Sequence, residues 1–161
     1  MPLTLFLPGP ADTDALGAAL ADAMPSSAAG ALVTLQGDLG SGKTALARAF
    51  LTALGHSGPV PSPTYTLVEP YDVLEYPFYH IDLYRISSTD ELEFLGWSDL
   101  RDGLILVEWP ERAPDLMAQA DLAIRLRYRE NGREAEIHSA GELGRLWQEN
   151  LQLSNLLTKP F

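Results

Sequence analysis

The chain contains no cysteine among its 161 residues. This absence excludes disulfide bonds, zinc sites built from thiolates and cysteine nucleophiles. Long apolar runs are also missing, because no stretch approaches the ~20 residues that a membrane-spanning helix needs. The first residues, Met1 to Leu7, contain no basic leader of the kind that begins a signal peptide. We therefore expect a cytoplasmic protein with no membrane segment.

Lysine and arginine are scarce. They number 11, against 22 aspartates and glutamates, and the net charge is −11. A protein that holds nucleic acid by itself usually presents a basic face, because neutralising phosphates dominates the affinity. A local basic patch is left open, but we expect tRNA or other RNA to be reached only indirectly, through a partner protein.

Apolar residues are plentiful, at 46% of the chain, which argues against disorder. A chain of this length is long enough to bury one proper core. We expect a single domain over residues 1–153 and a flexible tail over residues 154–161. The oligomeric state does not follow from these properties.

The most specific motif is Gly37-Asp38-Leu39-Gly40-Ser41-Gly42-Lys43-Thr44, which matches the phosphate-binding pattern G-x-x-x-x-G-K-[ST]. Its glycines allow positive φ and leave room for a phosphate against backbone N–H groups, which form an anion-binding nest. Lys43 supplies a cation for the β- and γ-phosphates, and the Thr44 hydroxyl is a ligand for Mg²⁺. All eight residues of this P-loop are therefore predicted to bind a nucleotide.

The residues on both sides of the P-loop support this interpretation. Residues 31–36 form a short apolar run typical of a buried strand, and residues 45–54 are rich in helix formers. The pattern also predicts strands at 3–7, 64–69, 76–84, 104–107, 121–128 and 134–139. Helices are predicted from Asp12 or Thr13 to Met24 and over 141–153, and a short helix is predicted to begin at Ser88, which forms a capping box with Glu91. We expect hairpin turns at 72–75 and at Asn131-Gly132.

This alternation predicts an α/β fold. We expect a P-loop NTPase-like sandwich with a mainly parallel central sheet, antiparallel strands at its edge and flanking helices.

Two carboxylates follow apolar stretches. Glu108 ends the apolar run 104–107, and a carboxylate at the end of a buried parallel strand emerges where such sheets bind ligands. We predict that Glu108 is a ligand of Mg²⁺, although a solvated strand end is the alternative. Asp82 follows a second apolar stretch and either binds Mg²⁺ through water or positions the hydrolytic water. His80 shares a strand face with Asp82, and we interpret it as a packed, hydrogen-bonded histidine rather than a metal ligand.

The loop at 62–66 carries hydroxyl groups just before a predicted strand. Thr64 is the candidate for a switch-like contact to the γ-phosphate, and a proline-rich turn with capping side chains explains the same residues equally well. Trp109, next to Glu108, is placed to cover the site or to report on it.

The base is predicted to be adenine. No Asn-Lys-x-Asp sequence occurs, so the usual carboxylate that reads guanine is missing, and ATP is the expected nucleotide. Candidates for an arginine finger are Arg85, Arg101 and Arg112, none of which lies in a diagnostic motif.

Five motifs occur in one order along the chain: Gly37–Thr44, Ser62–Glu69, His80–Arg85, Glu91–Gly96 and Val107–Glu111. Together they resemble the bacterial TsaE (YjeE) family, the ATPase of tRNA N6-threonylcarbamoyladenosine (t6A) synthesis. The resemblance covers residues 13–111 well and the last fifty residues only loosely. It implies a small Mg²⁺-dependent ATPase, weak alone, that supports turnover of a TsaB–TsaD complex.

The same resemblance implies roles for individual residues. Lys43 and the loop amides bind phosphate, Thr44 and Glu108 bind Mg²⁺, and Asp82 assists hydrolysis. Thr64 belongs to the switch-like loop and is counted with Lys43, Asp82 and Glu108 as catalytic. Thr13 matches a family position near the adenine.

Two other functions use the same loop. A small-molecule kinase would need an acceptor pocket and an arginine-rich lid, and no such lid segment is present in the sequence. A nucleotide-dependent binding module with negligible chemistry is the third possibility.

Overall fold

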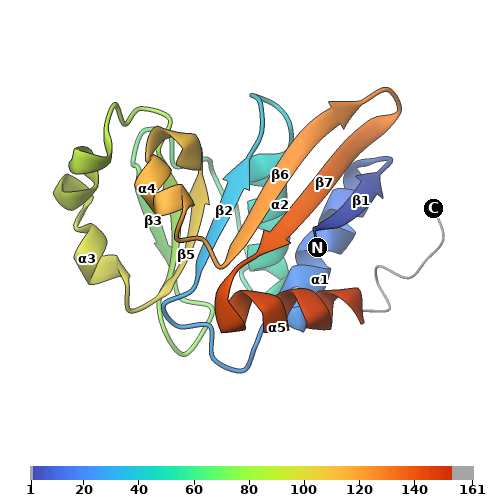
Figure 1. The fold of residues 1–161 in the computed structure, drawn as a ribbon, viewed down its shortest axis with the longest axis horizontal. Coiled ribbons are helices and arrows are strands. Elements are labelled where there is room, and N and C mark those ends of the chain that lie inside the picture. Colours follow the sequence, from blue (N-terminus) through green and yellow to red (C-terminus); the bar gives the residue numbers. More distant parts are fainter. Residues whose placement is uncertain (1, 154–161) are drawn as a thin grey trace.

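The computed structural model describes residues 2–153, and the predicted tail at 154–161 lies outside them. Seven strands form one sheet in the order β1-β7-β6-β2-β5-β4-β3 (Figure 1). The strands are β1 (Leu3–Leu7), β2 (Leu32–Gln36), β3 (Val68–Tyr71), β4 (Phe78–Asp82), β5 (Leu104–Glu108), β6 (Leu122–Arg129) and β7 (Gly132–Ser139). The helices are α1 (Pro10–Ala23), α2 (Lys43–Ala53), α3 (Trp97–Leu100), α4 (Pro114–Met117), α5 (Gly141–Gln152) and two 3₁₀ helices, η1 (Thr89–Leu95) and η2 (Pro110–Arg112).

The centre of the sheet is parallel and its flanks are antiparallel. β6, β2, β5 and β4 run parallel to one another, whereas β3 pairs antiparallel with β4, and β7 pairs antiparallel with both β6 and β1. The predicted α/β P-loop sandwich is therefore confirmed. The late hairpin is not itself the edge of the sheet, because β1 adds outside it.

Helices cover the central strands on both faces. One core cluster joins the sheet to α1, α2 and α5, and a second joins β2, β4 and β5 to η1 and α4. This double cover explains why β5 is buried along its whole length and reads as a continuous apolar run. None of the described helices covers the outer face of β6, β7 and β1, where Figure 1 shows the two long hairpin strands in the open.

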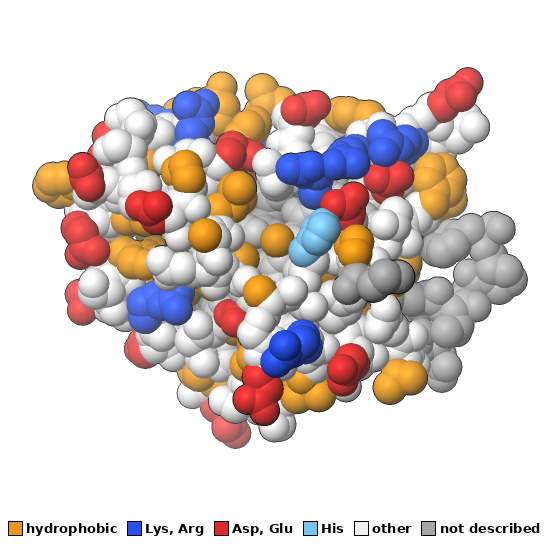
Figure 2. All heavy atoms as spheres, in the orientation of Figure 1, with side chains coloured by type: hydrophobic (Ala, Val, Ile, Leu, Met, Phe, Trp, Pro, Cys, Tyr) orange, Lys and Arg blue, Asp and Glu red, His pale blue; other side chains and the backbone are white. Residues whose placement is uncertain are grey.

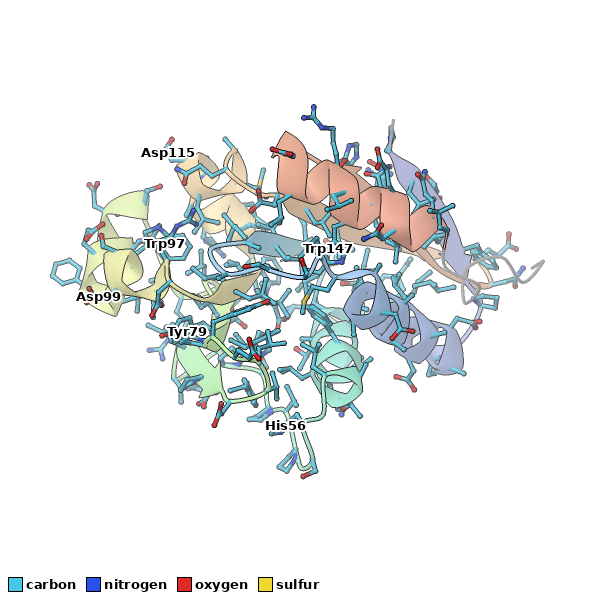
Figure 3. The ribbon with its side chains drawn as sticks, turned by 90° about the horizontal axis from the view of Figure 1, so that it is seen from below. His56, Tyr79, Trp97, Asp99, Asp115 and Trp147 are labelled. Atoms are coloured by element: carbon cyan, nitrogen blue, oxygen red, sulfur yellow. The ribbon has the colours of Figure 1, made fainter. Side chains whose placement is uncertain are left out.

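Trp147 packs α5 into the core cluster that contains α1 and α2. It points from α5 toward α1 and α2, as the view from below shows (Figure 3). Its side chain is fully buried, its indole N–H donates to the carbonyl of Leu20 at 3.0 Å, and its ring lies 6.1 Å from that of Phe50. α5 therefore belongs to the core rather than to a separate appendage.

The predicted strand at 64–69 is wrong in its first half. Residues 63–66 form a turn in which the N–H of Leu67 donates to the carbonyl of Pro63 at 2.7 Å. Leu67 has a φ of 69°, and β3 starts only at Val68. The hydroxyls of this segment bond to Asp82, and that tertiary contact overrides the local β preference.

Smaller differences concern the ends of elements. α1 begins at Pro10, earlier than predicted, and the carboxylate of Asp12 reaches back to the N–H of Gly9 at 2.8 Å. The predicted capping box is also shifted, because Glu91 accepts hydrogen bonds from Ser87 rather than from Ser88. The helix that follows is 3₁₀ in form.

The late hairpin turns one residue earlier than predicted. Arg129 pairs with Gly132, so the turn consists of Glu130 and Asn131. A Cβ on Gly132 would lie 2.5 Å from the carbonyl oxygen of Leu7, so this glycine serves a close approach to β1. The predicted hairpin between β3 and β4 is confirmed, but its loop covers residues 72–77 rather than 72–75, because β4 starts only at Phe78.

Membrane-spanning helices are also absent from residues 2–153, since none of the helices there is both long and apolar enough.

The contact between α1 and α2 gives a test of the packing. A Cβ on Gly17 would lie 2.4 Å from the Cβ of Ala49 and 2.8 Å from the nitrogen of Phe50. We expect Gly17→Ala to lower the free energy of unfolding by about 1–2 kcal/mol, because overpacking outweighs alanine's preference for helix. Urea unfolding measures the change. The control is Ala18→Leu, which borders a surface hollow and should stay within about 0.5 kcal/mol; an unchanged Gly17→Ala would contradict the close approach.

Candidate nucleotide-binding site

The P-loop runs from the end of β2 into the start of α2, at the carboxyl ends of the parallel strands. Gly40 has a φ of 77° and Gly42, the N-cap of α2, has a φ of 107°. Positive φ at these two positions requires glycine. Gly37 serves another purpose, because a Cβ there would lie 2.4 Å from Ser41 Oγ and 2.7 Å from the carbonyl oxygen of Leu126. The predicted loop glycines thus divide between conformational freedom and close packing.

Lys43 is bound to its own loop. Its amine donates to the carbonyls of Gly37 and Asp38, the latter at 3.2 Å, and lies 3.9 Å from the centre of the Trp109 ring. Burial lowers the pKa of Lys43, and the carboxylates around it, Glu108 foremost, raise it in part. A phosphate entering the loop would replace the two carbonyls as the partner of this amine.

Thr44 meets Glu108 across the end of the sheet. The Thr44 hydroxyl lies 3.1 Å and 3.2 Å from the two carboxylate oxygens. On its other side, Glu108 Oε2 lies 2.6 Å from Nε2 of His80, whose side chain is fully buried. Glu108 is only 2% exposed, so these two contacts keep a buried carboxylate satisfied.

These oxygens fit Mg²⁺. Residues 2–153 contain no cluster of three or more histidine, aspartate or glutamate side chains that would hold a metal by itself. Mg²⁺ does not need one, since it is usually held by one or two protein oxygens together with phosphates and waters. The hydroxyl of Thr44 and the carboxylate of Glu108 supply that kind of donor set beside the phosphate loop.

Asp82 anchors the switch-like loop. It lies beside Glu108, because β4 and β5 pair in parallel with these two residues in register. Its Oδ2 accepts from Thr64 at 2.9 Å and from Ser62 at 3.2 Å, while Oδ1 accepts from the N–H of Tyr84 at 2.8 Å. Both carboxylate oxygens are therefore occupied, and Asp82 fixes the position of the loop that carries Thr64.

One cavity of about 410 Å³ unites these groups. Its lining includes Lys43, Thr44, Ser62, Thr64, Asp82, Tyr84, Glu108, Trp109 and Arg133. Arg133 was not predicted, because it belongs to the distant β7 and reaches the loop only through the hairpin. Its Nη2 lies 3.3 Å from the carbonyl oxygen of Gly40. Hairpin geometry, not any local motif, places this second cation in the cavity.

The three predicted finger arginines lie elsewhere. Arg85, Arg101 and Arg112 each stack on an aromatic ring, and none of them lines this cavity. Thr13 is 2% exposed within α1 and also does not line it. The predicted place of Thr13 near an adenine stays a prediction.

Trp109 forms one wall of the cavity. It has a φ of 59° and ψ of 49°, a left-handed conformation that is uncommon for a bulky residue. Its ring packs against Lys43 on one side and lies 5.0 Å from the ring of Tyr84. The expectation that Trp109 covers the site agrees with this placement.

A family model described as "Threonylcarbamoyl adenosine biosynthesis protein TsaE" matches residues 7–136. The chain belongs to the TsaE family. Its relatives include the tRNA threonylcarbamoyladenosine biosynthesis protein TsaE of Haemophilus influenzae, which is 42% identical over 116 residues that cover 71% of this chain and 73% of the relative. The protein of the same name from Synechocystis is 42% identical over 123 residues, covering 73% and 76%.

A solved structure shares the fold. The crystal structure of Bacillus subtilis YdiB matches with a TM-score of 0.72 and 28% identity over 95% of both chains. The TsaE resemblance stated from five motifs is therefore confirmed, and the match extends into the hairpin beyond them. That extension includes Arg133, which the motif comparison had not reached.

The His80–Glu108 contact predicts a positioning role for the histidine. In His80→Phe, Glu108 loses the donor that orients it, so we expect the Mg²⁺ concentration for half-maximal binding of a fluorescent ATP analogue to rise about 10-fold or more. His80→Gln keeps a donor near Nε2 and should recover most of the loss. Binding of the ATP analogue without Mg²⁺ and the unfolding midpoint of each variant serve as controls. If His80→Phe and His80→Gln required the same Mg²⁺ concentration as each other, the positioning role would be contradicted.

Proposed function

We propose that this protein is a Mg²⁺-dependent ATPase that serves tRNA t6A biosynthesis together with TsaB and TsaD proteins. The observation that carries the proposal is the meeting of Lys43 and Thr44 with Glu108 and Asp82 in one cavity. A phosphate loop, a buried carboxylate and a hydroxyl-bearing loop are the parts that a nucleotide-hydrolysing site needs. The family and the names of its relatives support the pathway.

The chain's own residues divide the work. Lys43 and the backbone of the P-loop hold the phosphates, and Arg133 adds a second cation beside Gly40. Thr44 and Glu108 hold Mg²⁺, which when bound offsets the charge on the phosphates. Asp82 keeps the loop of Thr64 at the γ-phosphate end and orients the attacking water.

ATP is the proposed nucleotide, since the guanine-reading motif is missing from the sequence. A small-molecule kinase is less well supported. Such an enzyme needs arginines that close over the phosphates, and the cations lining the described cavity are Lys43 and Arg133 alone.

The role in the pathway rests on partners. The resemblance to TsaE implies that hydrolysis supports turnover of a TsaB–TsaD complex in the cytoplasm. Because the net charge is −11, counterion release adds little to the affinity of this chain for tRNA, so tRNA is reached through these partners. We expect slow ATP turnover by the chain alone and a change of that turnover when TsaB and TsaD are added.

Removing the Lys43 amine tests the nucleotide site. We expect Lys43→Ala to weaken ATP binding and turnover about 100-fold, the loss of a charged phosphate contact worth roughly 2–3 kcal/mol. Steady-state ATP hydrolysis with and without TsaB–TsaD measures the effect. Arg48→Ala removes an exposed charge from the same helix and is the control. Wild-type turnover in Lys43→Ala would exclude this site.

The roles of Glu108 and Asp82 can be told apart by how each substitution changes the Mg²⁺ dependence of ATP hydrolysis. We expect Glu108→Ala to raise the Mg²⁺ requirement, because this side chain contacts Thr44. Asp82→Asn should slow hydrolysis while ATP binding is largely kept. Titration of ATPase activity with Mg²⁺ decides between them, and a shifted midpoint in Asp82→Asn alone would mean that the two roles are reversed.

A further inference from the structure

A second cavity lies beside the P-loop and is distinct from the nucleotide cavity. It measures about 490 Å³. Its lining is formed by the start of the loop (Gln36, Gly37 and Asp38), by Trp109 and Glu111, and by β6 from Arg125 to Arg129. We call this cavity the β6 groove. It shares Gly37, Asp38 and Trp109 with the nucleotide site, but none of the roles proposed above uses β6 or Glu111.

One wall of the groove is basic. Arg125, Arg127 and Arg129 alternate along β6 and so project from one face of the sheet, spaced by about 6.5 Å. Figure 2 shows Lys and Arg side chains gathered in a row over the long hairpin, on the face that the described helices leave open. Three of the chain's 11 basic residues thus lie within five positions of an otherwise acidic protein.

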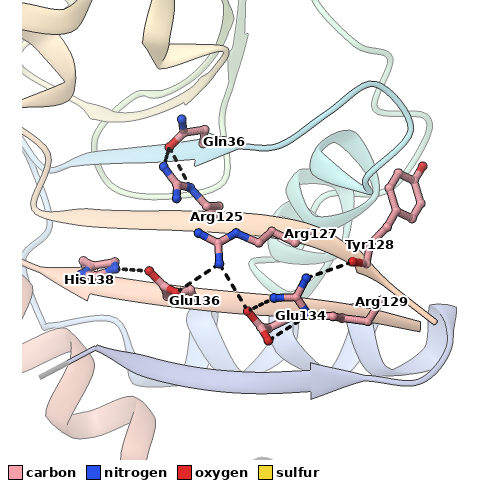
Figure 4. Close-up of polar contacts among 8 residues, drawn as sticks. All are labelled: Gln36, Arg125, Arg127, Tyr128, Arg129, Glu134, Glu136 and His138. Atoms are coloured by element: carbon pink, nitrogen blue, oxygen red, sulfur yellow. Dashed lines mark hydrogen bonds and ion pairs between the residues drawn. The ribbon is translucent and has the colours of Figure 1, made fainter. Parts of the chain in front are cut away.

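Arg125 and Arg127 are only loosely bound to their neighbours, whereas Arg129 forms a bidentate pair with Glu134 (Figure 4). Arg129 bonds Glu134 at 3.0 Å and 3.2 Å, and Arg127 lies 3.7 Å from each of Glu134 and Glu136. Arg125 hydrogen-bonds the Gln36 amide oxygen at 3.4 Å; its register neighbour Glu136 interacts with it electrostatically, but no ion pair within 4 Å joins the two among residues 2–153. Exposed pairs of this kind are worth about 0–1 kcal/mol, so an incoming carboxylate exchanges with them at low cost.

The opposite wall is acidic. Glu111 lines the groove, and because its Oε1 is buried and without a hydrogen-bond partner among the described residues, the side chain must turn outward for this oxygen to meet a donor. Asp38 adds a second carboxylate to this wall. An occupant must therefore offer acceptors to β6 and donors to Glu111. An acidic polypeptide does both, through its carboxylates and its main-chain N–H groups, whereas a phosphodiester backbone offers acceptors but no donors.

The groove is physically joined to the nucleotide cavity. Trp109 lines both, and it packs directly on the Lys43 amine. The carbonyl of Asp38, which also lines the groove, accepts a hydrogen bond from the same amine. An occupant of the groove would therefore touch the two groups that position Lys43.

We propose that the β6 groove binds an acidic segment of a partner protein, with carboxylates on Arg125 and Arg127 and N–H donors on Glu111, and that this contact acts on ATP turnover through Trp109. The inference rests on the proposed function for the partner, TsaB–TsaD, but the groove has a test of its own.

The test compares the double variant Arg125→Glu/Arg127→Glu with wild type and with Arg48→Glu, which reverses an exposed charge on α2. Two probes are used at physiological salt: the TsaB–TsaD complex of the same organism, and a fluorescein-labelled peptide of alternating Glu and Gly. We expect the double variant to bind both probes at least 10-fold more weakly, and Arg48→Glu to bind as wild type. Binding of an ATP analogue by each lone variant reports that it is folded.

The outcomes separate the two proposals. If wild type does not bind TsaB–TsaD, the proposed partnership fails, and the peptide alone decides on the groove. Unchanged peptide binding by the double variant, or no peptide binding by wild type, overturns the groove. A fluorescein-labelled oligouridine is the third probe: tighter binding than the peptide, lost in the double variant, would make the groove a nucleic-acid site and would also overturn the proposal.

Discussion

The parallel register of β4 and β5 places the carboxylates of Asp82 and Glu108 side by side at one end of the sheet. Glu108 is buried there, and a buried carboxylate persists only where donors surround it. Thr44 supplies one donor from the P-loop helix and His80 supplies the other from β4. The contact between Thr44 and Glu108 therefore ties the phosphate loop to the sheet, and the geometry of the site depends on it.

Local patterns predicted most of this arrangement. The P-loop is contiguous in sequence, and Glu108 follows an apolar run that only a doubly covered strand produces. Asp82 likewise follows an apolar stretch, and the pairing of β4 with β5 sets it in register with Glu108. Even so, His80 was interpreted as a packed histidine with no role assigned. It is packed, but its partner is the predicted metal ligand, and a single sequence does not reveal which residue a buried histidine contacts.

The features that the sequence did not reveal all depend on contacts across the fold. Thr64 lies in a turn rather than in the predicted strand because its hydroxyl donates a hydrogen bond to Asp82, 18 positions away. Arg133 lines the nucleotide cavity because the pairing of β7 with β6 brings its side chain within 3.3 Å of the carbonyl oxygen of Gly40. Likewise, nothing in the sequence groups the arginines of β6 with the P-loop. The pairing of β6 with β2 places them beside it. A one-residue shift of register would turn them to the other face.

The electrostatics of the site couple nucleotide and metal. Four carboxylates act on Lys43, namely Glu108, Glu111, Asp82 and Asp38, whereas Arg133 is the other cation that lines the cavity. Negative charge thus exceeds positive charge before any nucleotide enters, and a triphosphate adds more. Mg²⁺ on Thr44 and Glu108 would offset part of this excess, so we expect ATP to bind best as its Mg²⁺ complex. A partner segment in the β6 groove that engages Glu111 would remove one of the four carboxylates from this balance. Partner contact and nucleotide affinity would then be linked through charge as well as through Trp109.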